Sequence, residues 1–198
     1  MTDILALDPA AQDLLFREAR TANTFTDEPV TDEQVQAIYD LVKYGPTSMN
    51  MQPLRVVLVR SPEARERLVD LMMDGNKEKT RTAPLVAILA TDHEFHEELP
   101  TQFPHFPQAK DAIFGERPVR EWAGSFNAAL QAGYFIIGVR AAGLAAGPMT
   151  GYDAEGINKE FLDGDHAVLA VVNIGKPGED AWFPRGPRLA YDEVVTTV

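Results

Sequence analysis

Residues 31–60 read TDEQVQAIYDLVKYGPTSMNMQPLRVVLVR and predict a helix, a polar loop and a strand in direct succession. Thr31 and Gln34 form a capping box that starts the helix. Its apolar stripe consists of Val35, Ile38, Leu41 and Val42. Gly45 is expected to take the left-handed conformation that commonly ends a helix. The strand, residues 55–60, is a short β-branched run of the kind buried on both faces of a sheet.

The loop between them, residues 44–53, is suited to ligand binding. Pro46 and Pro53 fix the backbone near its two ends. Hydroxyl and amide groups are supplied by Thr47, Ser48, Asn50 and Gln52. A planar ligand edge with N–H and C=O groups would suit these donors and acceptors. The alternative is an ordinary polar connector, because Gly, Pro, Ser and Asn are common turn residues.

The rest of the chain predicts further helices and two more strands. In order, the patterns give a helix from Asp8 towards Arg20, a helix from Ser61 ended by Asp74 and Gly75, a strand at 85–90, a long helix at 121–142 ended by Gly143, a tight loop at 144–151, a helix capped by Asp153, and a strand at 167–174. No internal repeat or linker is visible, so residues 1–198 are expected to form a single domain.

Two segments fit no regular element. Residues 92–120 mix four prolines with several phenylalanines, and so long an excursion favours a lid or pocket wall. The tail, residues 180–198, is too short for its own core and is expected to dock on a neighbour. The long helix carries many Ala and Gly residues, which permit close packing either within a core or at a dimer seam.

Composition excludes several classes of function. The net charge of −12 and the pI near 4.7 argue against nucleic acid or an anionic membrane as a partner. The N-terminal residues 1–8 show no signal peptide and no helix predicts a membrane span, so a cytoplasmic location is expected. Without cysteine there is no disulfide or thiolate chemistry, and any redox activity needs an organic cofactor.

The usual catalytic motifs are missing from the sequence. No strand leads into a glycine-rich dinucleotide or phosphate loop, and no nucleophile motif supports a catalytic triad. His93 and His96 are three residues apart and are interpreted as part of a solvated acidic turn, so no metal site is expected. Phosphate and polar-ring binders remain in predicted loops: Arg20, Thr21, Asn23, Asn76, Lys79, Arg185 and Arg188.

Several of these segments together resemble the nitroreductase family of FMN-dependent oxidoreductases. They are residues 20–25 with 28–30, residues 46–53, Asn76 with Lys79, residues 144–151 and the arginine-containing tail. The resemblance is closer to the branch that contains malonic semialdehyde reductase of pyrimidine catabolism, on residues 19–21, 45–48, 75–76, 103–105 and 147–151. The chain differs from the commoner pattern in carrying Asn23 in place of a basic residue and Leu54 in place of Trp.

The resemblance implies an α+β fold, an α/β/α sandwich with a mainly antiparallel central sheet, in an interlocked homodimer with FMN at the subunit interface. Arg20, Thr21, Asn23, Arg185 and Arg188 would hold the phosphate and ribityl chain. Asn76 and Lys79 would face the pyrimidine edge, with Lys79 and Thr150 tuning the flavin, and Pro148, Met149, Thr150 and Gly151 would lie beside N5. Pro46, Thr47, Ser48, Asn50 and Gln52 would belong to the loop that the other protomer contributes.

The implied activity is NAD(P)H-dependent, with NADPH or NADH as co-substrate, and ends in hydride transfer to a second substrate. The leading acceptor is a small aldehyde acid such as malonic semialdehyde, for whose carboxylate Arg117 or Arg120 is a candidate. Both arginines have the alternative of being solvated residues at a helix start. Other possibilities are a broad reductase of nitroaromatics, quinones or enones, and a flavin-binding protein without turnover.

Overall fold

The computed structural model describes residues 4–198. Met1, Thr2 and Asp3, which belong to the segment judged to lack a signal peptide, lie outside the described residues. The helices are α1 (Pro9–Gln12), α2 (Asp32–Val42), α3 (Pro62–Asp70), α4 (Asp74–Thr82), α5 (Leu99–Gln102), α6 (Ala109–Ala112), α7 (Arg117–Ala141), α8 (Ala154–Phe161) and α9 (Tyr191–Val194). A π-helical turn (Asp13–Arg17) continues α1, and 3₁₀ turns occupy Ser48–Asn50 and Phe95–Glu98.

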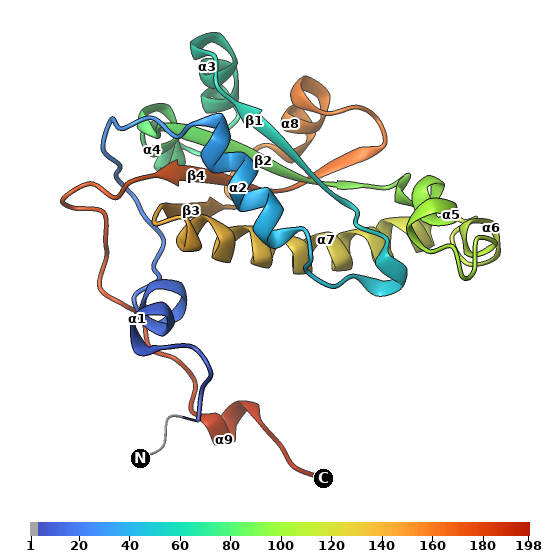
Figure 1. Cartoon of the computed structure of the whole chain (residues 1–198). Coiled ribbons are helices and arrows are strands. Elements are labelled where there is room, and N and C mark those ends of the chain that lie inside the picture. Colours follow the sequence, from blue (N-terminus) through green and yellow to red (C-terminus); the bar gives the residue numbers. More distant parts are fainter. Residues whose placement is uncertain (1–3) are drawn as a thin grey trace.

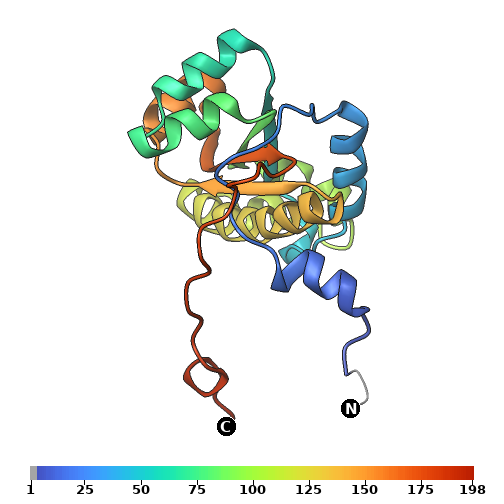
Figure 2. The same ribbon diagram turned by 90° about the vertical axis from the view of Figure 1, so that its left-hand side faces the viewer.

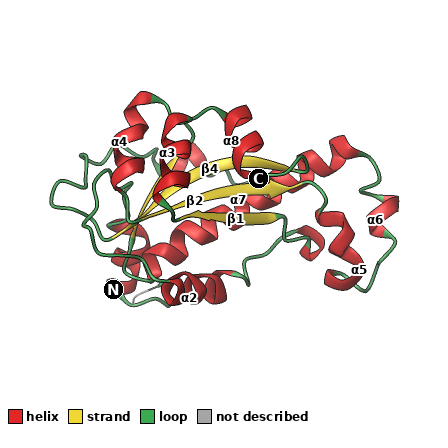
Figure 3. Cartoon of the chain, turned by 90° about the horizontal axis from the view of Figure 1, so that it is seen from above, coloured by secondary structure: helices red, strands yellow, loops and turns green. Residues whose placement is uncertain are grey.

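Within residues 4–198 the sheet has four strands, all antiparallel to their neighbours, in the order β1-β2-β4-β3. They are β1 (Leu54–Val59), β2 (Leu85–Asp92), β3 (Ala145–Met149) and β4 (His166–Gly175). Helices cover both faces (Figures 1 and 3). One face packs against α2 and α7, and the other against α3 and α8. The α+β sandwich implied by the resemblance is therefore confirmed.

Several sequence predictions hold at residue level. Thr31 and Gln34 form both bonds of the capping box at the start of α2. Ser61 and Asp153 cap α3 and α8, and Gly143 has a φ of 73° after α7. The strands predicted at 55–60, 85–90 and 167–174 are β1, β2 and β4 to within a few residues. These signals are local, so packing did not override them.

Three local predictions were wrong. Asp74 and Gly75 do not end a helix; α3 ends at Asp70, and Asp74 opens α4, so Asn76 and Lys79 lie on a helix and not in a loop. The restart has a physical cause: the Met73 N–H donates to the Gly151 carbonyl (3.1 Å) and pins the chain there. Gly45 does not adopt positive φ. A glycine suits this position because a Cβ would lie 2.9 Å from the Tyr134 ring.

The segment predicted as a tight loop at 144–151 contains β3, which pairs with β4. Its Ala and Gly residues lack strand propensity, but the position needs small side chains: a Cβ on Gly147 would lie 2.6 Å from the Ala22 carbonyl oxygen. β1 was expected to be buried on both faces. It is an edge strand, and Val56 is 38% exposed.

The structure separates the two alternatives predicted for the small residues of helix α7. Most of its small residues face the chain's own core: Gly124 lies against Thr91 and Phe95, and Gly138 against Ile38 and Val42. The exposed face instead carries large side chains at helical spacing, Trp122, Phe126, Leu130 and Tyr134. The Trp122 and Phe126 rings are stacked at 6.1 Å. An apolar surface of this kind on a well-packed chain indicates an interaction site.

Both ends of the chain extend away from the body (Figure 2). Residues 183–198 are all exposed, and only Ala181 and Trp182 just before them are buried or partly buried. The apolar side chains of this tail are more than 60% exposed at Phe183, Leu189, Tyr191 and Val194. Among the described residues no helix combines the length and apolar character needed to cross a bilayer.

Candidate functional site

Three arginines converge on one cavity beside the C-terminal end of α7. The cavity has a volume of about 220 Å³, and its polar lining includes Arg20, Thr21, Arg140 and Arg188. Pro148 at the end of β3 forms part of the wall. The Nε of Arg20 is buried without a hydrogen-bond partner among the described residues, while its guanidinium lies 5.5 Å from the centre of the Trp182 ring. A concave site with convergent guanidinium groups is suited to an anion.

The sequence did not point to Arg140. It lies in the apolar helix α7 and is 9% exposed, and its guanidinium donates to the Leu14 carbonyl (3.1 and 3.2 Å). Burial lowers the pKa of Arg140 below its ordinary value, and the positive charge of Arg20 lowers it further. The available signal was an arginine within an otherwise apolar helix, since buried charges usually have a partner.

Two predicted anion ligands lie beside this cavity and not in its wall. The guanidinium of Arg185 donates to the carbonyl oxygens of Arg17 and Ala19 (3.0 Å for the latter), which ties the tail to the segment carrying Arg20. The Asn23 amide faces the carbonyls of Thr21 and Ala181 at 3.4 and 3.5 Å. In this chain both residues therefore organise the backbone around Arg20.

A second group of predicted residues meets where α4 approaches the end of β3. The Asn76 amide donates to the Gly151 carbonyl at 2.9 Å. A Cβ on Gly151 would lie 2.7 Å from that amide nitrogen, so a larger residue here would displace the Asn76 side chain. Lys79, one turn further along α4, is half-buried, and its ammonium group has no ion pair within residues 4–198. A cation is thus available beside backbone and amide groups.

Asn173 on β4 fixes the C-terminal part of α4. It is fully buried, and its amide donates to the Lys79 carbonyl at 3.0 Å. The carbonyls in the last turn of a helix lack helical partners, so this bond caps α4. The same amide nitrogen lies 3.9 Å from the Met149 sulfur. Met149, 6% exposed, is therefore a packing residue of the strand next to Thr150 and Gly151.

The loop at 46–52 is well fixed but lies elsewhere. The Ser48 N–H donates to the Asn127 side chain (2.8 Å), and the Gln52 N–H donates to the Thr47 hydroxyl (3.2 Å). Asn127 and Arg140 are both on α7, and the rise of 1.5 Å per residue separates them by roughly 20 Å. Figure 1 shows the loop and α1 at opposite ends of α7. One chain alone therefore does not bring the loop to the arginine cavity.

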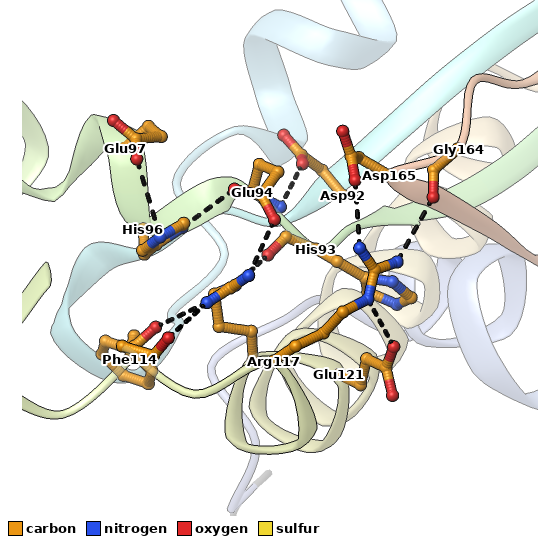
Figure 4. A network of polar contacts seen from close by, with 12 residues as sticks. Asp92, His93, Glu94, His96, Glu97, Phe114, Arg117, Glu121, Gly164 and Asp165 are labelled. Carbon is orange, nitrogen blue, oxygen red and sulfur yellow. Dashed lines mark hydrogen bonds and ion pairs between the residues drawn. The ribbon is translucent and has the colours of Figure 1, made fainter. Parts of the chain in front are cut away.

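The arginines considered for substrate binding are both engaged, and Figure 4 shows Arg117 with its partners. Arg117 pairs with Glu121 (2.8 Å) and Asp165 (3.1 Å). Arg120 pairs with Glu94 (3.0 Å) and donates to three carbonyls, those of His93, Phe114 and Gly115. The interpretation of Arg120 as solvated was wrong, because its side chain is only 12% exposed. Arg120 therefore connects the start of α7 to the rest of segment 92–120, and Arg117 connects it to the turn at 164–165.

The predicted solvated turn at His93–His96 is buried. His93 and His96 are 7% and 6% exposed, and burial lowers the pKa of His93. Side-chain atoms of Glu94, His96 and Glu97 lie within 4.8 Å of one another, close enough for a metal ion to be considered. Each of the two carboxylates, however, already has a cation: Arg120 for Glu94 and Lys110 for Glu97. These pairs account for the cluster as a structural network.

Comparison with known proteins relates the chain to one family. A model described as the nitroreductase family matches residues 16–176. A protein of Streptomyces griseus, provisionally named an NADH dehydrogenase/NAD(P)H nitroreductase, is 80% identical over 194 residues, which is 98% of this chain and 99% of the relative.

Two solved structures show the same fold. A provisionally named nitroreductase of Bacillus subtilis has a TM-score of 0.87 at 23% identity, covering 96% of this chain and 100% of its own. A provisionally named nitroreductase of Exiguobacterium sibiricum, solved in complex with FMN, has a TM-score of 0.83 at 21% identity over 100% of both chains.

Proposed function

The chain belongs to the nitroreductase family, and from this premise we propose that it is an FMN-dependent NAD(P)H oxidoreductase whose flavin sites are completed by a second copy of the chain. Two observations carry the proposal. One is the cavity with Arg20, Arg140 and Arg188, whose wall includes Pro148 of β3, and the other is a half-buried Lys79 without an ion pair among the described residues, on the helix that meets the end of the same strand. The phosphate, and the pyrimidine edge of the ring once it is reduced, are the two parts of FMN that positive charge would stabilise.

The residues present fit this cofactor. The arginine cavity would hold the phosphate, and the unpartnered Nε of Arg20 supplies a donor for it. Asn76, Lys79 and the backbone of 150–151 would face the polar ring edge. FMN supplies the redox chemistry, accepting a hydride from NAD(P)H and delivering one to a second substrate. The chain contributes binding, orientation and charge, and needs no protein nucleophile.

Lys79 has a specific electrostatic task in this proposal. A bound flavin would carry more negative charge on its pyrimidine part when reduced, and the Lys79 ammonium group would stabilise that charge more than the neutral oxidised ring. The Lys79 carbonyl is held by Asn173, so the backbone position from which this side chain extends is fixed. Lys79 thus favours hydride acceptance as well as binding.

Replacing Lys79 by Ala should leave the fold intact and slow bleaching of the bound flavin by NAD(P)H about tenfold, which corresponds to about 1.4 kcal/mol of transition-state stabilisation. The measurement is stopped-flow absorbance under anaerobic conditions. Lys77→Ala is the matched control, since Lys77 lies on the same helix but pairs with Asp74. If Lys79→Ala binds and reduces flavin like the unchanged protein, Lys79 is not part of the site.

The homodimer is supported by two surfaces. The exposed stripe Trp122, Phe126, Leu130 and Tyr134 lies on α7 between the loop end and the arginine end. Two copies of α7 packed antiparallel about a twofold axis would place the loop of one chain beside the arginine cavity of the other. In this arrangement Pro46, Thr47, Ser48, Asn50 and Gln52 reach the flavin from the partner.

The second surface is the open edge of the sheet. An apolar cavity of about 370 Å³ lies between α2 and β1, lined by Val35, Val42, Leu54, Val56 and Phe135 among others. Among the described residues no strand pairs with the outer side of β1, and such edges are usually covered. The partner's tail, with Leu189, Tyr191 and Val194 exposed, has the apolar residues to cover it.

The acceptor is proposed to be a neutral planar molecule, such as a nitroaromatic, quinone or enone. Segment 92–120 is proposed as the lid over the acceptor pocket. Each Lys and Arg of this segment, namely Lys110, Arg117 and Arg120, is paired with an acid. The segment offers aromatic surface instead, with Phe103 beside His105 and Phe106 partly exposed. This arrangement favours a neutral substrate over the aldehyde acid suggested by the closer sequence resemblance.

A direct comparison of acceptors tests this proposal. With NADPH or NADH as donor, kcat/KM for a nitroaromatic or a quinone should exceed that for malonic semialdehyde by at least about tenfold, the cost of leaving a carboxylate without a cation. A higher kcat/KM for malonic semialdehyde would instead support the aldehyde-acid reductase. Absence of any turnover, with flavin bound, would leave only a flavin-binding protein.

A further inference from the structure

The loop at 46–52 adopts an unfavourable backbone conformation. Met49, Asn50 and Gln52 have φ values of 50°, 51° and 44°, in the left-handed region that residues with a Cβ rarely occupy. Such conformations persist only where surrounding contacts impose them, and they concentrate at functional sites. The contacts that impose this conformation therefore decide whether the loop is ready to bind.

Part of the restraint comes from within the loop. The Asn50 N–H donates to the Thr47 carbonyl (3.1 Å), and the Gln52 side-chain amide donates to the Asn50 side-chain carbonyl (3.1 Å). These bonds link the left-handed residues to one another, but they do not fix the loop to the rest of the chain. An external restraint is needed as well.

Gln102, at the end of α5, provides that restraint for both polar left-handed residues. Its backbone carbonyl accepts from the side-chain amide of Asn50 (2.9 Å), and its side-chain Oε1 accepts from the side-chain amide of Gln52 (3.0 Å). Gln102 is half-buried, so these bonds are partly shielded from water. It belongs to segment 92–120, the proposed lid of the acceptor pocket.

A hydrophobic anchor joins the same two segments. Met51, between the left-handed residues, is 2% exposed and packs in a cluster with Phe95, Leu99 and Phe114 of the segment. Phe95 and Phe114 are in edge-to-face contact at 5.2 Å. The loop and the segment are consequently one packed unit, joined by an apolar anchor and by Gln102.

We propose that Gln102 is a positioning residue that couples the lid, segment 92–120, to the loop at 46–52. Through this coupling it sets both the affinity for FMN and the apparent affinity for the acceptor. This inference rests on the proposed function. Since the Gln102 side chain holds Gln52, a change in the lid is transmitted to the flavin edge. Coupling between two binding events is reciprocal, so acceptor binding tightens FMN to the same extent as FMN tightens the acceptor.

The test compares Gln102→Met, which removes the Oε1 acceptor, with Gln102→Glu, which keeps it. Gln102→Met should weaken FMN binding and raise the KM of the acceptor, each about fivefold, as expected for one lost hydrogen bond, with kcat little changed. Gln102→Glu should restore both values. Gln108→Ala is the matched control, because Gln108 is exposed on the same segment and its side chain forms no hydrogen bond with described residues.

A double-mutant cycle shows whether Gln102 acts through Gln52. In a Gln52→Met background the additional Gln102→Met substitution should have almost no further effect on FMN affinity. If the full effect of Gln102→Met persists in that background, or if Gln102→Glu is as defective as Gln102→Met, the proposed coupling is wrong.

A readout without flavin separates this inference from the proposed function. Hydrogen exchange of the backbone amides at 49–52 in the flavin-free protein should be about fivefold faster in Gln102→Met than in Gln108→Ala. Unchanged exchange would refute the coupling. Failure of the unchanged protein to bind FMN would refute the proposed function, while faster exchange in Gln102→Met would still support the restraint by Gln102.

Discussion

A chain ending at Pro184 is expected to lose FMN and to sediment as a monomer. The deletion removes Arg188 from the cavity wall and Arg185 from the carbonyls beside Arg20. Loss of the Arg188 charge from the wall, and of the Arg185 bonds that hold the backbone beside Arg20, should together weaken phosphate binding about a hundredfold, and loss of the tail uncovers the partner's sheet edge. Flavin content after gel filtration, and mass by sedimentation, measure both effects.

Two controls separate the effect of losing Arg185 and Arg188 from the effect of losing the tail. Arg185→Gln with Arg188→Gln in the full-length chain should lose FMN but remain dimeric. A chain ending at Glu193 keeps both arginines and should retain flavin. If the chain ending at Pro184 binds flavin normally as a monomer, the two-chain site is incorrect and each protomer holds its cofactor alone.

Gly147→Ala is expected to lower the free energy of unfolding by at least about 2 kcal/mol, because the added methyl group overpacks a rigid position. Its Cβ would lie 2.6 Å from the Ala22 carbonyl oxygen, which is backbone and cannot rotate away. The residues it would push, 20–23, include Arg20 and Thr21 of the anion cavity, so FMN affinity should fall as well. Chemical denaturation and flavin titration measure the two losses.

Gly164→Ala is the matched control. A Cβ on Gly164 would meet no atom within 4 Å, and Gly164 does not have positive φ. Its unfolding free energy should therefore change by less than about 0.5 kcal/mol. A Gly147→Ala protein as stable as Gly164→Ala would show that the segment at 20–23 moves freely and is not held by β3.

The parts of the fold that were predictable carry their signal locally. The capping box at Thr31, the proline after Ser61 and the apolar runs of β2 and β4 each identify an element from adjacent residues. β3 was missed because its strand character comes from pairing with β4 and not from its Ala, Gly and Pro residues. The start of α4 at Asp74 likewise depends on the bond from the Met73 N–H to the carbonyl of Gly151, which is far away in sequence.

The candidate site shows the same division. Family resemblance led to Arg20, Thr21, Arg188 and Pro148, which the structure places around one cavity. Arg140 was not found, because nothing in a helix sequence says which face of the helix meets the residues around position 20. The ion pairs of Arg117 with Asp165 and of Arg120 with Glu94 were also invisible, since they join segments that approach only on folding.

The distance of about 20 Å along α7 between the loop at 46–52 and the arginine cavity has a kinetic consequence in the proposed dimer. A folded chain by itself has all its helices and strands but only part of each site. Recovery of activity after denaturation is then limited by an encounter of two chains, so its rate rises with protein concentration while recovery of helical signal does not. Specific activity likewise falls on dilution below the dissociation constant of the dimer.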